Sequence, residues 1–331
     1  MANISITTAC NRDCAYCFAR GAEVRVVRPE AHMPLAVFEA ALDFLERSGI
    51  PEVRVLGGEP TVHPGFERIV DMVVSRGLSL VLFSGGLMPE PALRTLESLP
   101  ESAASVLLNT PVPLPGRPFE PARIDDVCRR LGPRVMLGVT IDSPAVRLEP
   151  LFDAIDRHGL HRSVRLGLAQ PAWGASNTYL HPRHYPEVGR RVAVFARVAR
   201  RRGVGLEFDC GWVPCMFPDG AVADLGPDTA SIGARCSPVL DLLPDGRFIS
   251  CYPLVRLGSL ELRSDLDAGG ARAYFEARRA GAGPRFLSAD CDGCEWRAGG
   301  TCDGGCFSAA LLRRRDGRLA EAAGWRAHGR G

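Results

Sequence analysis

The sequence predicts an α/β fold in which parallel strands alternate with helices. Two observations lead to this prediction. Short runs of β-branched and aliphatic residues recur over the first two-thirds of the 331-residue chain. Segments with apolar residues three or four positions apart lie between these runs. Helices of this length between strands are typical of right-handed βαβ units, which place their strands side by side in one parallel sheet.

The elements follow one another in a regular order. The predicted strands are residues 3–8, 53–56, 78–83, 105–109, 135–141 and 164–168. The predicted helices are residues 34–48, 66–76, 93–99, 124–131, 151–158 and 183–202. In the first helix, Leu35, Phe38 and Leu42 share one face, and Gly49 provides a natural end. The segment after Gly205 is rich in Gly and Pro and has only short apolar runs, which predicts a loop-rich region.

Composition is that of an ordinary globular enzyme. The chain is 46% hydrophobic and 24% charged, and its net charge of +2 gives no general attraction to nucleic acid or to a membrane surface. It has no signal peptide and no apolar run long enough to span a membrane. The 12 cysteines are grouped at metal-ligand spacing, which favours a reducing compartment over a disulfide framework. We therefore expect a cytoplasmic protein without nucleic-acid or membrane partners.

Three cysteines lie together just beyond the first strand. Cys10, Cys14 and Cys17 have the spacing C-x3-C-x2-C, and no fourth cysteine follows in this loop. Such a loop can hold three corners of a [4Fe–4S] cluster and leave one iron open to another ligand. A structural zinc site, or a group of reduced thiols without metal, is the alternative. The position supports the cluster, because α/β barrels and open α/β sheets carry their chemistry at the C-terminal ends of strands.

The loop resembles the signature of the radical S-adenosylmethionine (SAM) superfamily, with Tyr16 in the aromatic position before the last cysteine. The resemblance implies that the open iron chelates the methionyl end of SAM. It also implies that an electron from the cluster cleaves SAM and releases a 5′-deoxyadenosyl radical. The implied fold is a partial (β/α)6 TIM-like barrel, open on one side to admit a bulky substrate. The implied electron source is an external donor of the flavodoxin or ferredoxin type.

A glycine-rich turn closes the second strand. Gly57 and Gly58 allow the backbone to come close to a ligand, and Glu59 offers an acceptor for an ammonium group. Together with Pro60, these residues resemble the GGEP motif of the family, which implies that they hold the amino group of SAM. His63, just beyond the motif, is equally compatible with a structural role in the turn and with a substrate contact.

Three more positions match SAM contacts of the family. Many relatives have Thr-Asn-Gly at the end of the third strand, whereas this chain has Ser84 followed by Gly85. Ser84 and bare backbone would then replace the missing Asn side chain. Thr140 and Asp142 stand where relatives place residues near the SAM carboxylate and ribose. The resemblance implies that Ser84, Thr140 and Asp142 bind SAM.

The C-terminal third carries a second set of cysteines. Its pattern is Cys236-x9-Gly246-x4-Cys251, then Cys291-x2-Cys294-x7-Cys302-x3-Cys306. This pattern resembles the SPASM extension of radical SAM enzymes, which carries auxiliary iron–sulfur clusters. Two departures stand out: two extra residues precede Cys302, and the last cysteine of the usual pattern is missing after Cys306.

The number of remaining cysteines fits two further clusters. Cys128 shares a helical face with Ile124 and Leu131, which predicts a buried structural thiol. Without it and the first three, eight remain, enough for two fully ligated cubanes. By analogy, the first auxiliary cluster uses Cys236, Cys251, Cys306 and one of Cys210 and Cys215, and the second uses Cys291, Cys294, Cys302 and the other one. A single cluster beside a zinc or an open auxiliary site is the alternative.

The resemblance covers nearly the whole chain, as a radical SAM core at 1–205 and a SPASM-like domain at 206–331. It suggests oxidative or epimerising maturation of a ribosomally made precursor peptide, as in natural product biosynthesis. No catalytic residue is predicted beyond the radical cluster. Because the chain begins at the first strand, we expect a separate peptide-recognition protein or direct leader binding. The alternatives are radical tailoring of a sugar, nucleoside or cofactor precursor, and a non-catalytic iron–sulfur or zinc module.

Overall fold

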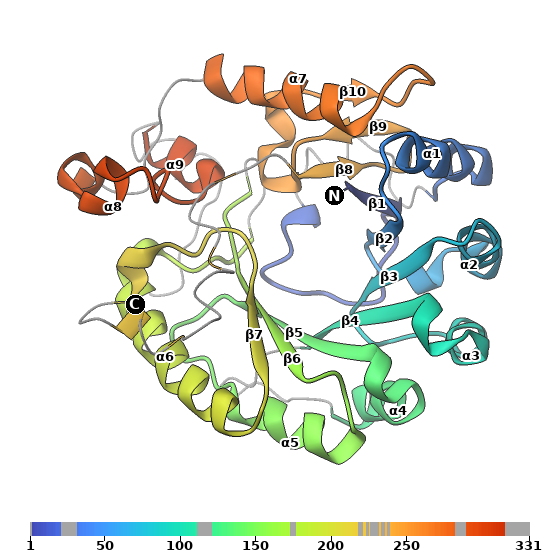
Figure 1. Ribbon diagram of the computed structural model, residues 1–331, viewed down its shortest axis with the longest axis horizontal. Coiled ribbons are helices and arrows are strands. Elements are labelled where there is room, and N and C mark those ends of the chain that lie inside the picture. Colours follow the sequence, from blue (N-terminus) through green and yellow to red (C-terminus); the bar gives the residue numbers. More distant parts are fainter. Residues whose placement is uncertain are drawn as a thin grey trace.

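A curved, mostly parallel sheet forms the centre of the protein, and helices cover its outer face (Figure 1). The computed structural model describes residues 2–20, 32–110, 121–172, 177–217, 239–281 and 289–314, together with residues 221, 222, 225, 232 and 236. The strands follow the spatial order β10-β9-β8-β1-β2-β3-β4-β5-β6-β7. Strands β1 to β7 are parallel to their neighbours, β8 is parallel to β1, and β9 and β10 are antiparallel additions.

The elements agree with the predicted alternation. The strands are β1 Ala2–Thr7, β2 Glu52–Gly57, β3 Ser79–Ser84, β4 Ala104–Thr110, β5 Val135–Ile141, β6 Ser163–Leu168, β7 Gly205–Phe208, β8 Leu240–Leu242, β9 Arg247–Ile249 and β10 Leu260–Glu261. The α-helices are α1 Leu35–Arg47, α2 Phe66–Ser75, α3 Glu90–Ser98, α4 Pro121–Leu131, α5 Glu149–His158, α6 Tyr185–Arg201, α7 Ala268–Gly281, α8 Glu295–Ala298 and α9 Phe307–Arg314.

The predicted partial barrel is confirmed, and the structure extends it. A seventh parallel strand, β7, follows α6, and within the described residues the sheet ends at β7 and β10 without closing. The predicted domain boundary at 205/206 falls inside β7. The short strands β8 to β10 come from the region predicted to be loop-rich, and they continue the sheet beside β1. The division into two domains therefore stays a prediction.

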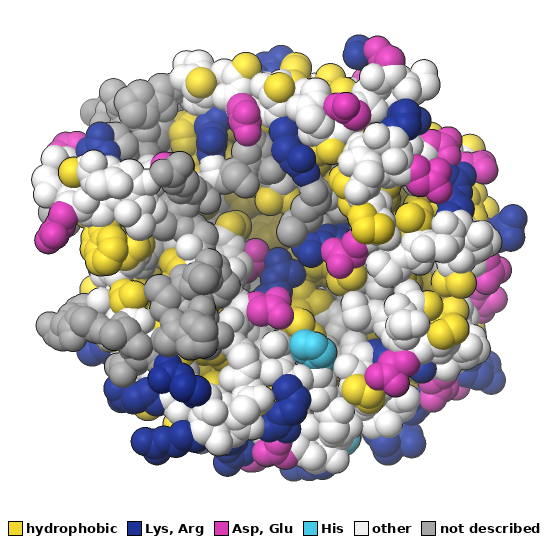
Figure 2. Space-filling model, in the orientation of Figure 1, with side chains coloured by type: hydrophobic (Ala, Val, Ile, Leu, Met, Phe, Trp, Pro, Cys, Tyr) yellow, Lys and Arg dark blue, Asp and Glu magenta, His cyan; other side chains and the backbone are white. Residues whose placement is uncertain are grey.

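The two faces of the sheet differ in burial. Val53 and Val55 of β2, like Leu80 and Leu82 of β3, are fully buried and join the main hydrophobic core with the helices. The residues that alternate with them are half-buried. Alternation of this kind places one face of each strand against the helices and the other toward the interior of the barrel. The space-filling view shows a hollow near the middle of the molecule, with charged side chains around it (Figure 2).

Pairing of β8 with β1 joins the C-terminal region to the start of the chain. In this register Asn3 lies opposite Asp241, and the Asn3 side-chain amide donates a hydrogen bond of 2.7 Å to the Asp241 carboxylate. Burial raises the pKa of Asp241 to about 7. None of the described helices is both long and apolar enough to cross a membrane.

Candidate functional site

The three-cysteine loop leaves β1 at its C-terminal end, as predicted. Cys10 is exposed, Cys14 and Cys17 are half-buried, and none forms a disulfide. A turn holds the last two together, since the Cys17 N–H donates to the Cys14 carbonyl at 3.0 Å. Burial raises the pKa of the Cys14 thiol, and a hydrogen bond from the Tyr16 hydroxyl opposes this shift. Tyr16 thus has a specific role in this loop, because its hydroxyl can stabilise a sulfur anion.

The two glycines of the GGEP motif approach the cysteine loop itself. A Cβ atom at Gly57 would lie 2.4 Å from the Thr7 carbonyl oxygen, and one at Gly58 would lie 2.1 Å from the Ala9 carbonyl oxygen. The N–H groups of Gly58 and Glu59 donate to those same two carbonyls, each at 2.8 Å. The sequence predicted a close backbone approach to a ligand. In this structure the glycines are required because β2 packs directly against the segment that leads into Cys10.

Glu59 is buried, and its carboxylate already has several donors within the protein. It accepts hydrogen bonds from the Thr61 N–H at 3.2 Å and hydroxyl at 2.6 Å, from the Ser84 hydroxyl at 3.0 Å, and from the Gly85 N–H at 2.8 Å. The motif and the end of β3 are therefore linked through one carboxylate. Pro60 is buried at the start of the following 3-10 turn, Pro60–Val62. Two predicted SAM contacts, Glu59 and Ser84, thus lie together beside the cysteine loop.

Gly85 leaves room for Arg12 of the cysteine loop. A Cβ atom at Gly85 would lie 2.9 Å from Cδ of Arg12 and 3.5 Å from a Glu59 carboxylate oxygen. A side chain at this position would therefore require Arg12 to move. Arg12 was not predicted, and it also lowers the pKa of Cys14 through its positive charge.

Asp142 is the predicted contact beyond β5 that interacts with the three-cysteine loop. Asp142 is buried just after β5, accepts a hydrogen bond of 3.3 Å from the Thr178 hydroxyl, and raises the pKa of Cys14 by its negative charge. Thr140 is half-buried on β5. Of the predicted SAM contacts, Asp142 therefore joins Glu59 and Ser84 around the loop.

Two residues after β6 secure the loop from the other side. The Thr178 N–H donates to the Ala15 carbonyl at 2.8 Å. The Asn177 side-chain amide donates to the Tyr16 carbonyl at 3.2 Å and to the Gln170 carbonyl at 2.9 Å. Sequence reasoning did not identify Asn177 or Thr178, because isolated polar residues in a loop have no local pattern that reveals a long-range partner.

His63 has a structural role. The Gly65 N–H donates to Nδ1 at 2.9 Å, and Nε2 lies 3.0 Å from the Met33 carbonyl, so both ring nitrogens have backbone partners. Burial lowers the pKa of this histidine. The ring is therefore a neutral imidazole with its proton on Nε2. Of the two roles that the sequence left open, the turn-side role is the one observed.

Four of the C-terminal cysteines form a first group: Cys210, Cys236, Cys251 and Cys306. Burial raises the pKa of Cys210, Cys251 and Cys306, and the charges of other members of the group raise these pKa values further. Cys306 directly precedes α9, and its thiol accepts from the N–H groups of Ser308 and Ala309. Such donors favour a thiolate.

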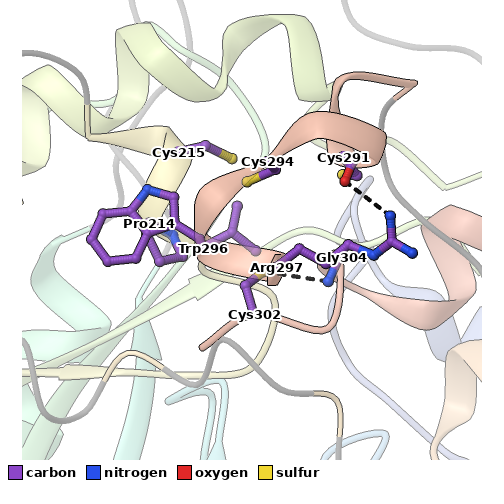
Figure 3. Close-up of a pocket in the computed structure, with 9 residues that line it drawn as sticks. Pro214, Cys215, Cys291, Cys294, Trp296, Arg297, Cys302 and Gly304 are labelled. Atoms are coloured by element: carbon purple, nitrogen blue, oxygen red, sulfur yellow. Dashed lines mark hydrogen bonds between the residues drawn. The ribbon is translucent and has the colours of Figure 1, made fainter. Parts of the chain in front are cut away.

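The other four form a second group: Cys215, Cys291, Cys294 and Cys302. They line one pocket together with Trp296 and Arg297, and Figure 3 shows the sulfur atoms of Cys215 and Cys294 directed toward each other. Burial raises the pKa of Cys215 to about 11, and the charges of the other three cysteines contribute. The Gly304 N–H donates to the Cys302 sulfur at 3.3 Å. The structure thus groups Cys210 with the first set and Cys215 with the second.

The C-terminal region also contacts the three-cysteine loop. The rings of Phe18, next to Cys17, and Tyr252, next to Cys251, lie 5.4 Å apart, and the Tyr252 hydroxyl donates to Ser5 of β1 at 2.6 Å. Cys128, by contrast, is buried in α4 and belongs to neither group, as predicted. In the part of the chain that the structure describes, no three His, Cys, Asp or Glu side chains converge as ligands of a single metal ion.

Comparison with protein families identifies the first part of this chain. Residues 4–131 match the family model of the radical SAM superfamily. This stretch, which is less than half of the chain, is therefore similar to a radical SAM domain. The domain contains the three-cysteine loop and the GGEP turn, and its family uses SAM and a [4Fe–4S] cluster as cofactors. The donor set fits this cluster, because three thiols in one loop, with an N–H donor to the Cys10 sulfur, leave one iron corner without a protein ligand.

Two curated relatives match about 30% of the chain. Both are S-adenosylmethionine-dependent nucleotide dehydratases. The protein of Thermoplasmatales archaeon (strain ISO4-H5) is 30% identical over 99 residues, which are 30% of this chain and 34% of that protein. The protein of Selenomonas ruminantium is 32% identical over 93 residues, which are 28% of this chain and 32% of that protein. The chain therefore spans about a third of the length of each relative.

Solved structures resemble the chain over almost its full length. SuiB of Streptococcus suis, bound to the precursor peptide SuiA, superimposes with a TM-score of 0.66 at 14% identity, covering 95% of this chain and 73% of that one. The enzyme anSMEcpe with bound AdoMet superimposes with a TM-score of 0.65 at 14% identity, covering 97% and 98%. At this identity the likeness establishes the fold, which includes the region beyond the radical SAM domain.

Proposed function

We propose that this chain is a radical SAM enzyme that modifies a ribosomally made peptide, by oxidation or epimerisation, with the help of two auxiliary [4Fe–4S] clusters. The observation that carries the proposal is the grouping of the eight C-terminal cysteines into two sets of four. Each set has the number of thiolates that fully ligates one cubane. The sets lie next to a radical SAM domain, in a fold that the peptide-bound SuiB structure shares.

Each cofactor has its own residues in this proposal. Cys10, Cys14 and Cys17 hold the radical cluster. The first group, Cys210, Cys236, Cys251 and Cys306, holds one auxiliary cluster, and the second group, Cys215, Cys291, Cys294 and Cys302, holds the other. SAM is bound around Gly57, Gly58, Glu59, Pro60, Ser84, Thr140 and Asp142. The half-buried interior face of the strands leaves space beside these residues.

The chemistry that the loaded site supplies is hydrogen abstraction by a 5′-deoxyadenosyl radical. The task of the protein is then to hold the target C–H bond in place and to exclude water, because so reactive a species is controlled by position. Asn177 and Thr178 fix the cysteine loop by its backbone, and Gly58 and Glu59 fix it from the opposite side. A rigid loop keeps the reacting groups at a constant distance from the substrate.

The partners follow from the same proposal. An external electron donor of the flavodoxin or ferredoxin type reduces the radical cluster, and the precursor peptide binds directly or through a separate small recognition protein. The radical SAM core at 1–205 and the SPASM-like domain at 206–331 remain the proposed division of the chain. The tight β1–β8 pairing supports two regions that share one sheet.

A nucleotide or another small molecule is the second candidate substrate. The specific observation in its favour is the pair of nucleotide dehydratase relatives, which are at least 30% identical over the stretch that they match. Those matches span less than a third of this chain. The peptide substrate is favoured because the fold similarity to SuiB covers 95% of the chain.

Intact mass spectrometry of a candidate precursor peptide tests this function. The peptide, encoded beside the gene for this chain, is coexpressed anaerobically with the enzyme and any small neighbouring recognition protein. We expect a mass loss of two hydrogens, or uptake of deuterium from a deuterated solvent for epimerisation, and neither with Cys14→Ala. An unchanged peptide in both solvents, with SAM cleavage still active, would favour the small-molecule substrate. Absence of SAM cleavage with all clusters present would favour a non-catalytic module.

A further inference from the structure

Gln170 carries a buried amide that lacks hydrogen-bond partners. This residue lies two positions beyond the end of β6, and it is only 5% exposed. Both Oε1 and Nε2 of its side chain are buried and have no hydrogen-bond partner in the part of the chain that the structure describes. Native proteins rarely leave both ends of a buried amide unpaired. Within the described residues, this amide is therefore available to pair with a bound ligand.

The Gln170 amide lies against the backbone directly after Cys210, a member of the first cysteine group. Gly211, which directly follows Cys210, has φ +99°, and a Cβ atom at that position would lie 2.3 Å from Nε2 of Gln170. Only glycine adopts this backbone conformation readily and leaves room for the amide. The chain therefore has glycine at the one place where the backbone beside Cys210 meets the side chain of Gln170.

Other residues beside the first group hold the Gln170 segment in place. The hydroxyl of Ser308, which lies two residues after Cys306, contacts the Pro171 carbonyl at 2.9 Å and the Pro253 carbonyl at 3.0 Å. Pro253 in turn lies two residues after Cys251. The segment that carries Gln170 thus contacts chain positions next to two of the four cysteines in the first group, Cys210 and Cys306.

Tyr185 of α6 adds a second buried polar group at the same place. It is 4% exposed, and its pKa is raised by burial and by the nearby cysteines Cys306, Cys215 and Cys210, which belong to both groups. The Gln170 amide lies close enough to lower this pKa, but without the geometry of a hydrogen bond. The phenol therefore lies near members of both cysteine groups, and the Gln170 amide lies beside it.

We propose that the Gln170 amide donates a hydrogen bond to sulfur at the first cysteine group and thereby raises the reduction potential of the cluster bound there. The proposal rests on the proposed function, because the acceptor is a thiolate or a sulfide of an auxiliary [4Fe–4S] cluster. Hydrogen bonds to sulfur are one of the means by which proteins set the potentials of such clusters. A donated N–H stabilises the reduced cluster, since reduction adds negative charge.

A redox titration followed by EPR tests the proposal in the full-length, cluster-loaded protein. Cys14→Ala removes the radical cluster, so that only the auxiliary signals remain. In this background Gln170→Met is compared with the parent. We expect the potential of one auxiliary cluster to fall, with at least a tenfold smaller reduction equilibrium constant, or about 59 mV for one electron. The other auxiliary cluster is the internal control, and its potential should stay the same.

An isotope experiment gives a second, independent readout. Gln170 is the only glutamine in the chain, so 15N-glutamine labels a single side-chain amide. We expect a 15N hyperfine coupling to one reduced auxiliary cluster, which disappears in Gln170→Met. This measurement on the labelled parent tests the proposal even if Gln170→Met does not fold. Gln170→Glu keeps the size but removes the donor, so its potential should fall as well.

The outcomes separate the two levels of the proposal. Auxiliary clusters that are present, with unchanged potentials and no 15N coupling, would overturn the role of Gln170 and leave the proposed function intact. A protein that binds no auxiliary cluster would overturn both. A fall in potential that is confined to one cluster, together with the 15N coupling, would support both.

Discussion

Gly58→Ala is a direct test of how the GGEP turn works. The substitution adds one methyl group, and this position does not have a positive φ, so backbone preference plays no part. The new Cβ atom would lie 2.1 Å from the Ala9 carbonyl oxygen and 2.6 Å from its carbon. Both of these atoms belong to the backbone and cannot rotate away. Relief therefore requires β2 and the segment before Cys10 to separate by about 1.4 Å, since nonbonded contacts are normally about 3.5 Å.

The free-energy cost follows from what that separation breaks. The hydrogen bonds from Gly58 N–H to Thr7 and from Glu59 N–H to Ala9 are both 2.8 Å long. Each contributes about 0.5–1.5 kcal/mol net. Overpacking in a tight region adds about 1–3 kcal/mol. We therefore expect Gly58→Ala to lower the free energy of unfolding by about 2–6 kcal/mol.

Anaerobic chemical denaturation measures this cost, and iron analysis measures its effect on the site. Gly281→Ala is the matched control: a Cβ atom there has nothing within 4 Å, and Gly281 lies at the end of α7. Its stability should stay the same or rise slightly, because alanine favours a helix. In Gly58→Ala the radical cluster should be lost before the two auxiliary clusters, because the strained contact adjoins only the loop of Cys10.

Two results would refute this reasoning. Equal denaturation midpoints for Gly58→Ala and the parent would mean that β2 does not hold the loop through this contact. Normal stability with weakened SAM binding would instead mean that the glycine serves a ligand, as the sequence alone suggested.

Three further predictions concern single residues. Cys210→Ala should remove only the first auxiliary cluster, and Cys215→Ala only the second. Iron analysis should then show a loss of about four iron atoms per chain in each variant. Loss of the same cluster in both variants would contradict the grouping. Glu59→Gln should destabilise the protein by about 1–3 kcal/mol in chemical denaturation, because a neutral amide leaves buried donors partly unpaired, and an unchanged midpoint would contradict this. The pKa of His63 is lower in the folded state than in the unfolded state, where it is near 6.5. The residue therefore contributes stability above about pH 6.5, and this contribution is lost as the pH falls through the folded pKa. The parent should therefore lose more stability than His63→Gln between about pH 7 and pH 5, and parallel pH curves would exclude this role.

The sequence was sufficient to predict the fold class and to identify the three-cysteine loop. Periodicity of two and of 3.6 residues revealed the strands up to β6 and the helices between them, because each is a local pattern. The spacing of Cys10, Cys14 and Cys17 is local as well. The eight C-terminal cysteines could be counted in the same way. These features need no knowledge of which segments meet in space.

Strands β7 to β10 were not recognised, and the reason is their length. They span two to four residues, too few for a period to appear, and β8 is a strand because it pairs with β1 and β9. The same limit applied to Asn177 and Arg12. Each acts on a distant part of the chain, and no local signal identifies its partner.

The partition of Cys210 and Cys215 illustrates the difference most clearly. Only four residues separate these cysteines, and spacing alone left either one compatible with either cluster. The path from β7 through the turn Pro214–Met216 directs Cys210 toward Cys236, Cys251 and Cys306, and Cys215 toward the opposite group. The local spacing of the cysteines showed that enough ligands are present for two clusters, because this requires only a count of one residue type. Which ligands belong together was decided only by tertiary structure, because convergence on one cluster depends on where distant segments pack.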